Sequence, residues 1–119
     1  MLEDEDGTDE HLHVLLTSPS LAGEVVTVSI STRRAKSETL VCLQPGEHAF
    51  ITRPSVCPYR FAKIRSESSI IAAINNGTAR LKDPASEALI SKLVAGLMDS
   101  DFAPPGIKAF YLGVTVTNP

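Results

Sequence analysis

Two segments near the start of the chain alternate apolar and polar residues. Residues 11–17 (HLHVLLT) and 24–31 (EVVTVSIS) both repeat with a period of two, and the second places Val26, Val28 and Ile30 on one side. Because successive side chains of a β-strand point to opposite faces, this pattern predicts two strands. The connection between them is rich in serine, proline and glycine, so we expect a hairpin.

Shorter extended segments follow this hairpin. Residues 40–44 (LVCLQ) end at the turn signal Pro45-Gly46, in which proline presets φ and glycine tolerates a positive φ. A second short extended segment is expected at 49–51. Residues 59–65 (YRFAKIR) alternate again and predict a further strand.

The character of the sequence then becomes helical. Residues 67–75 carry isoleucines at helical spacing, with Ser66 as the expected N-cap and Gly77 as the stop. A second helix is expected from Asp83, as its cap, to about Asp99, because its leucines and other apolar residues form one stripe.

A last alternating segment, residues 110–116, predicts a closing strand. The order is therefore strands first and helices second, which is typical of the α+β class. We expect a small curved antiparallel sheet or an SH3-like barrel with two C-terminal helices.

Charge divides the 119 residues unevenly. Six acidic residues lie within the first ten positions, and the remainder carries eleven Lys and Arg against eight Asp and Glu. We therefore expect residues 1–10 to be an acidic flexible tail and residues 11–119 to be a single, mildly basic α+β domain. Such a basic domain suits an acidic partner or nucleic acid.

Composition also bears on location. The sequence contains no apolar run of about 20 residues and its start is acidic, so it predicts neither a membrane partner nor a signal peptide. A cytoplasmic protein is expected. Cys42 and Cys57 lie among apolar residues and are expected to be small buried hydrophobes rather than a disulfide.

The three histidines raise the question of a metal. The pair His11 and His13, with the run PGEH at 45–48, is similar to motifs of the cupin family, whose small barrel binds a metal. The carboxylate that follows the histidine pair in that family is missing, because Val14 comes next. The sequence therefore favours no metal ligands and no cofactor, and a cupin-like metal protein is the third interpretation.

Polar and cationic residues gather at predicted strand ends, which a small curved sheet can bring onto one face. Arginine and hydroxyl groups are suited to the extra negative charge of a pentacovalent phosphorus, and histidine transfers protons near neutral pH. The candidate catalytic residues are Thr32, Arg33, Arg34, His13 and His48. The candidate substrate-binding residues are Ser31, Lys36, Arg53, Ser55 and Arg60.

The order of these segments resembles the MazF/PemK toxin family, small SH3-like barrels with a C-terminal helix. The resemblance lies in HLHVLLTSP, EVVTVSISTRR, TLVCLQPGEH, PSV and YRFAKIR, which occur in that order, and in the helical DPASEALISKLVAGL. It implies metal-independent cleavage of single-stranded RNA, restrained by an antitoxin peptide, and matches Thr32 to the family's hydroxyl at the end of the long strand. Where that family has a first strand and an arginine, this chain has MLEDEDGTDE.

The leading hypothesis is therefore a toxin-like component of a toxin–antitoxin pair, acting as an endoribonuclease by 2′-hydroxyl attack on the adjacent phosphate. Its expected partners are an antitoxin protein or peptide, single-stranded RNA and a second copy in a homodimer. The alternative hypothesis is a non-catalytic module on the same barrel, which would bind a protein or peptide at its strand edges and basic loop.

Overall fold

The computed structural model describes residues 2–6, 9–34, 37–48, 51–81 and 84–117. At its centre lies the predicted hairpin, formed by β2 (Asp9–Leu15) and β3 (Glu24–Thr32), which are antiparallel. Its register sets Leu12 opposite Ile30 and Val14 opposite Val28, so the apolar residues of both strands share one face. The hairpin prediction is confirmed.

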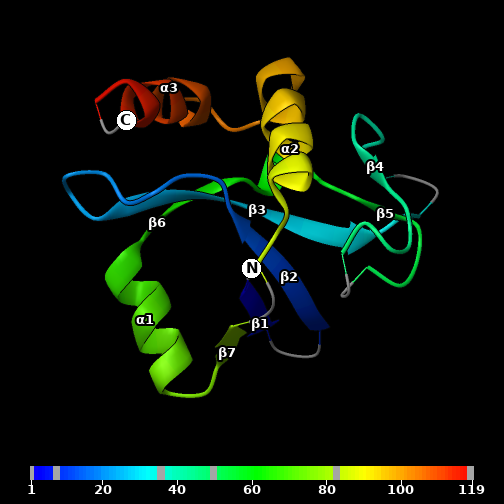
Figure 1. Cartoon of the computed structure of the whole chain (residues 1–119), viewed down its shortest axis with the longest axis horizontal. Helices are drawn as coiled ribbons and strands as arrows, with labels where there is room; N and C mark the ends of the chain where they lie inside the picture. Colours follow the sequence, from blue (N-terminus) through cyan, green and yellow to red (C-terminus); the bar gives the residue numbers. More distant parts are fainter. Residues whose placement is uncertain (1, 7–8, 35–36, 49–50, 82–83, 118–119) are drawn as a thin grey trace.

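The sheet extends from both sides of this hairpin (Figure 1). On one side, β1 (Leu2–Asp6) pairs with β2, and β7 (Ala79–Leu81) pairs with β1. On the other side, β6 (Lys63–Ser66) pairs with the first half of β3, while β5 (Ser55–Val56) pairs with its end and β4 (Cys42–Leu43) pairs with β5. The order β7-β1-β2-β3-β6 forms an open antiparallel sheet that does not close into a barrel.

Two helices cover one face of the sheet. Figure 1 shows α2 (Glu87–Asp99) and α3 (Ile107–Thr117) on the same side of β3. The buried stripe of α2, which includes Leu93 and Leu97, packs with Val26 and Val28 in the main core. Burial of this apolar surface is the main stabilising term of the fold.

The remaining helix, α1 (Glu67–Asn75), lies on the opposite side of the sheet (Figure 1). The Ser66 side chain accepts a hydrogen bond from the Ser69 main-chain N–H at 3.2 Å, as the predicted N-cap requires. Ile70 packs in a second, smaller cluster with Val25 and Ala79. Because this cluster is small, α1 covers only one end of its face.

The α+β class is thus confirmed, and four local expectations need correction. Residues 2–6, expected in a flexible tail, form β1, because their backbone pairs with both β2 and β7. Residues 110–116, expected to form a closing strand, belong instead to α3 (Ile107–Thr117), because Ile107, Phe110 and Tyr111 have helical spacing and pack on the core.

The other two corrections concern the residues at which a strand and a helix begin. The strand expected at 59–65 begins as a 3₁₀ turn, η1 (Tyr59–Phe61), before β6. The second helix begins later than expected, because the Ser86 side chain caps it by accepting a bond from the Leu89 N–H at 3.1 Å. Asp83, the expected cap, lies outside the described residues.

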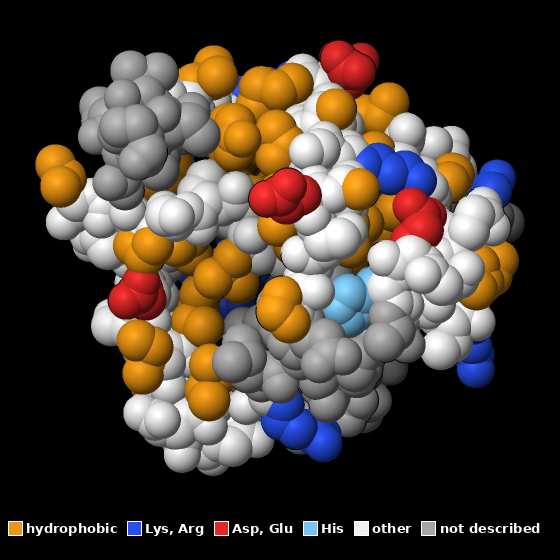
Figure 2. All heavy atoms as spheres, viewed as in Figure 1, with side chains coloured by type: hydrophobic (Ala, Val, Ile, Leu, Met, Phe, Trp, Pro, Cys, Tyr) orange, Lys and Arg blue, Asp and Glu red, His pale blue; other side chains and the backbone are white. Residues whose placement is uncertain are grey.

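The surface carries apolar as well as charged side chains. Figure 2 shows hydrophobic side chains gathered where α2 and α3 meet, and Lys and Arg side chains separated from one another around the visible face. In the described part of the chain, no helix has the length and apolar character needed to cross a membrane.

Candidate functional site

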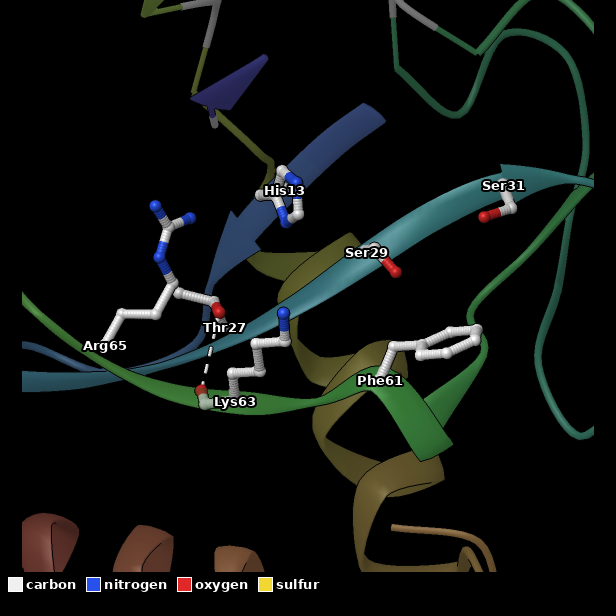
Figure 3. Close-up of a pocket in the computed structure, with 7 residues that line it drawn as sticks. All are labelled: His13, Thr27, Ser29, Ser31, Phe61, Lys63 and Arg65. Carbon is white, nitrogen blue, oxygen red and sulfur yellow. Dashed lines mark hydrogen bonds between the residues drawn. The ribbon is translucent and has the colours of Figure 1, made fainter. Parts of the chain in front are cut away.

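A pocket of about 360 Å³ lies on the face of β3 that is opposite α2. Figure 3 shows its lining: one side chain from β2, three hydroxyl side chains along β3, and an aromatic and two cationic side chains from η1 and β6. These residues are His13, Thr27, Ser29, Ser31, Phe61, Lys63 and Arg65. The pocket therefore continues the face that α1 covers at its other end.

Strand pairing is what brings these residues together. Ser29 is the register partner of His13 on β2, and Thr27 is the partner of Lys63 on β6. Arg65 follows two residues after Lys63 and therefore points to the same face. Alternate residues of β3 and β6, together with His13 of β2, thus form the floor and one wall of the pocket.

The floor of the pocket is shielded from solvent. Thr27 is only 2% exposed and Ser29 is 8% exposed. The Thr27 hydroxyl donates a long hydrogen bond to the main-chain oxygen of Lys63, at 3.4 Å (Figure 3). The Thr27 proton is used in this bond, whereas the Ser29 hydroxyl on the same shielded floor can give a hydrogen bond to an anionic oxygen.

The electrostatic character of the lining is positive. It contains an ammonium group, a guanidinium group and an imidazole, and none of its seven residues is Asp or Glu. Cationic groups beside hydroxyl donors suit phosphate oxygens, because hydrogen bonds with a charged partner are shorter and stronger than neutral ones.

Phe61 forms the rim of the pocket at the end away from Arg65 (Figure 3). Its side chain is 54% exposed, and the Arg60 guanidinium carbon lies 5.0 Å from the ring centroid. This is cation–π geometry. Arg60, a predicted substrate-binding residue, therefore lies beside the pocket rather than in its lining.

The predicted site residues divide between this pocket and a second location. His13 and Ser31 line the pocket. Thr32, one residue further along β3, is exposed and by strand alternation points to the other face. The predicted grouping of Thr32 with Ser31 around one ligand is therefore not favoured by the strand geometry.

The second location is the end of β3, where Thr32 is the register partner of Ser55. The Arg33 N–H donates to the Pro54 oxygen at 2.9 Å, and the buried Ser55 hydroxyl donates to the Arg53 oxygen at 2.8 Å. Main-chain contacts thus bring the end of β3 next to residues 53–55, as predicted. The Ser55 hydroxyl is used to stabilise this turn.

The other predicted residues lie elsewhere. Arg34 is exposed, and its main-chain N–H donates to the Ser37 hydroxyl at 2.8 Å. His48 is buried in the turn after β4, where its main-chain oxygen accepts a bond from Ile51. Lys36 lies outside the described residues.

The two cysteines have different surroundings. Cys57 is fully buried, and desolvation raises the pKa of its thiol to about 12, so it is not a nucleophile at neutral pH. Burial also raises the pKa of the neighbouring Tyr59 hydroxyl, which donates to the Leu93 oxygen at 2.7 Å. Cys42 is partly buried and is also a free thiol.

Five lining residues were missed by the prediction: Thr27, Ser29, Phe61, Lys63 and Arg65. Their signal was present as alternation, because hydroxyl residues stand at positions 27, 29 and 31, and an aromatic and two cationic residues stand at positions 61, 63 and 65. What the sequence alone does not contain is the register that sets these two lines side by side.

Comparison with protein-family models, with curated proteins and with solved structures finds no match to this chain. Among the described residues, no three His, Cys, Asp or Glu side chains gather as a group able to hold a metal ion.

Proposed function

We propose that the pocket binds single-stranded RNA through its phosphate groups. The observation that carries this proposal is the placement of Lys63 and Arg65 beside three hydroxyl side chains on one shielded sheet face. Cationic and hydroxyl side chains are the usual partners of nucleic-acid phosphates. The resemblance to the MazF/PemK family favours RNA as the polymer.

The binding test compares two double variants with the same net charge. Lys63→Ala with Arg65→Ala removes two cations from the pocket, whereas Lys92→Ala with Lys108→Ala removes two from α2 and α3, on the other side of the sheet. Binding is measured by fluorescence anisotropy of a short labelled single-stranded RNA over a series of salt concentrations.

The pocket variant is expected to weaken binding at least roughly tenfold, because charge-assisted hydrogen bonds are lost. It should also reduce the slope of log K against log salt by about 1.4, since each phosphate contact to a single strand contributes about 0.7. The control variant should keep both the RNA affinity and the salt slope of the wild type. Equal losses in the two variants would show that only net charge matters and would refute a site at this pocket.

Cleavage of the bound RNA is a second candidate function, favoured by His13 in the same lining. In this reaction the 2′-oxygen forms a bond to phosphorus and the bond to the 5′-oxygen breaks. Neutral His13 would take the 2′-hydroxyl proton and then return it to the departing 5′-oxygen. Lys63 and Arg65 would stabilise the phosphorane, in place of the predicted Thr32, Arg33 and Arg34.

Cleavage is tested by incubating the protein with single-stranded RNA in the presence of EDTA. The expected products carry a 2′,3′-cyclic phosphate and a 5′-hydroxyl, and RNA with a 2′-deoxy substitution at the scissile nucleotide should resist. His13→Ala should bind RNA as before and lose at least a hundredfold in rate. Binding without turnover in the wild-type protein would eliminate this second candidate and leave the binding function.

The toxin role and the antitoxin partner stay predictions of the family resemblance. An acidic antitoxin peptide would compete with RNA for Lys63 and Arg65, so displacement of labelled RNA by such a peptide would support this role. A peptide that binds equally well to the Lys63→Ala, Arg65→Ala double variant would instead favour the alternative, a binding module that uses another surface.

A further inference from the structure

Phe61 is an exposed aromatic side chain that the phosphate-binding proposal does not use. It is 54% exposed although it lies at the rim of the pocket and belongs to its lining. An exposed ring forgoes the free energy that burial gives, so a ligand that covers it gains that free energy on binding. Its position next to a cation-lined wall suits a ligand that has both anionic and flat apolar parts.

The ring is held out by the contacts of the residues just before it. The Glu38 carboxylate accepts hydrogen bonds from the main-chain N–H groups of Tyr59 and Arg60, both at 3.2 Å. Its Oε2 also lies 3.8 Å from Arg60 Nε. Tyr59 is fully buried and anchored to Leu93. These contacts fix the main chain of η1 at Tyr59 and Arg60, from which the Phe61 side chain projects.

Arg60 lies over one face of the Phe61 ring. Its guanidinium carbon lies 5.0 Å from the Phe61 ring centroid, and the same side chain is held by Glu38. An aromatic ring with a guanidinium on one side is a surface on which a nucleobase stacks, since every base presents a π-face.

We propose that Phe61, braced by Arg60, is a stacking platform for one unpaired nucleobase, and that Glu38 is the positioning residue that holds it. This inference rests on the proposed binding of RNA and names the part of the RNA that the rim contacts. The base lies on Phe61 while the adjoining phosphates lie along Lys63 and Arg65. A base already stacked in a duplex cannot reach the ring, so the site selects single strands.

The experiment uses the full chain and a short single-stranded RNA that contains 2-aminopurine, whose fluorescence is quenched when it stacks. Phe61→Leu removes the π-system but keeps apolar bulk. Phe102→Leu is the matched control, because Phe102 is also an exposed phenylalanine, at 62%, and lies in the segment after α2.

Phe61→Leu is expected to abolish the quenching and to weaken binding roughly 5- to 150-fold, the range for loss of one base–aromatic stack. The salt slope should stay unchanged, because the phosphate contacts remain. Phe102→Leu should behave as the wild type. Quenching that survives Phe61→Leu, or equal affinity for a duplex of the same sequence, would overturn the platform.

Glu38 is tested by Glu38→Gln, which keeps the size of the side chain and removes its charge. The expected result is reduced 2-aminopurine quenching with an unchanged salt slope of RNA binding. A general loss of folded protein would not change the first quantity and leave the second unchanged. Glu38→Asp, which keeps the charge but shortens the reach, is the second variant and should also reduce quenching. Wild-type quenching in either folded variant would refute the positioning role.

These outcomes separate the two proposals. If wild-type protein binds no single-stranded RNA, or if removal of Lys63 and Arg65 matches the control, the proposed function fails and the platform fails with it. If the salt slope of RNA binding depends on Lys63 and Arg65 but 2-aminopurine fluorescence is still quenched by the Phe61→Leu variant, the binding function stands and only the platform is wrong.

Discussion

The two faces of β3 are equally shielded at their centre but have opposite chemistry. Val28 is 1% exposed on the face under α2, and Thr27 is 2% exposed on the pocket face. On the first face helices close over valine and isoleucine side chains, whereas on the second hydroxyl side chains lie under a cationic wall. Low exposure alone therefore does not separate residues that stabilise the fold from residues that form a site.

The strongest test of this comparison is a cavity on the α2 side. Leu93→Ala is expected to lower the free energy of unfolding by about 2–5 kcal/mol, because Leu93 is fully buried in the main core. The measurement is urea denaturation followed by circular dichroism. RNA affinity, measured well below the unfolding midpoint, should not change, because Tyr59 donates to the main-chain oxygen of residue 93, which the substitution keeps. A parallel loss of affinity would show that the Leu93 side chain also positions the pocket face.

A smaller effect is expected from Gly96→Ala on the same helix. An added Cβ at Gly96 would collide with the Tyr59 hydroxyl and with Val41. Such overpacking costs about 1–3 kcal/mol. Because Tyr59 belongs to η1 with Phe61, this substitution is also expected to reduce 2-aminopurine quenching.

The matched control for that substitution is Gly113→Ala on α3, where an added Cβ meets nothing within 4 Å. It should leave stability unchanged or raise it by up to about 1 kcal/mol, through the better helix propensity of alanine. If the Gly96→Ala and Gly113→Ala variants had the same free energy of unfolding, the close packing of α2 on Tyr59 would be disproved.

On the other side of the sheet, Ser66→Ala removes the N-cap of α1. The expected loss is about 1 kcal/mol, since the bond to the Ser69 N–H disappears. Thermal denaturation measures it. Because the cluster under α1 is small, a loss above that of Leu93→Ala would reverse the assignment of the main core to the α2 side.

The smallest effect on stability is expected in the pocket itself. Lys63 is exposed, so Lys63→Ala should change the free energy of unfolding by no more than about 0.5 kcal/mol while it weakens RNA binding. Urea denaturation and anisotropy on the same preparation compare the two quantities. A large loss of stability with no change in binding would assign Lys63 to the fold rather than to the site.

Local patterns explain which parts of the fold were predictable. The β2–β3 hairpin and the Ser66-capped α1 depend on alternation and capping within a few residues, and both were predicted. The β1 strand pairs with β2 and with Ala79–Leu81, and the acidic side chains of residues 2–6 show no apolar alternation that would reveal either pairing. The α3 helix was mistaken for a strand because period-two matches within residues 110–116 masked its helical stripe.

The candidate site divides in the same way. His13 and Ser31 were predicted and lie in the pocket, because each has a recognisable chemical type on a well-predicted strand. Lys63 and Arg65 were missed because their place beside Thr27 depends on the β3–β6 register, a contact between distant segments.

The pairing of β1 with β7 has a further consequence for the order of folding. It sets Leu2 opposite Leu81, whereas the β2–β3 hairpin joins strands separated by one short loop. Closing a long loop loses more chain entropy than closing a short one, and contacts between distant residues slow folding. We therefore expect β1, β2 and β3, which follow one another closely in the sequence, to pair early and the β1–β7 contact to form last, so that β7 is the final strand to join the sheet.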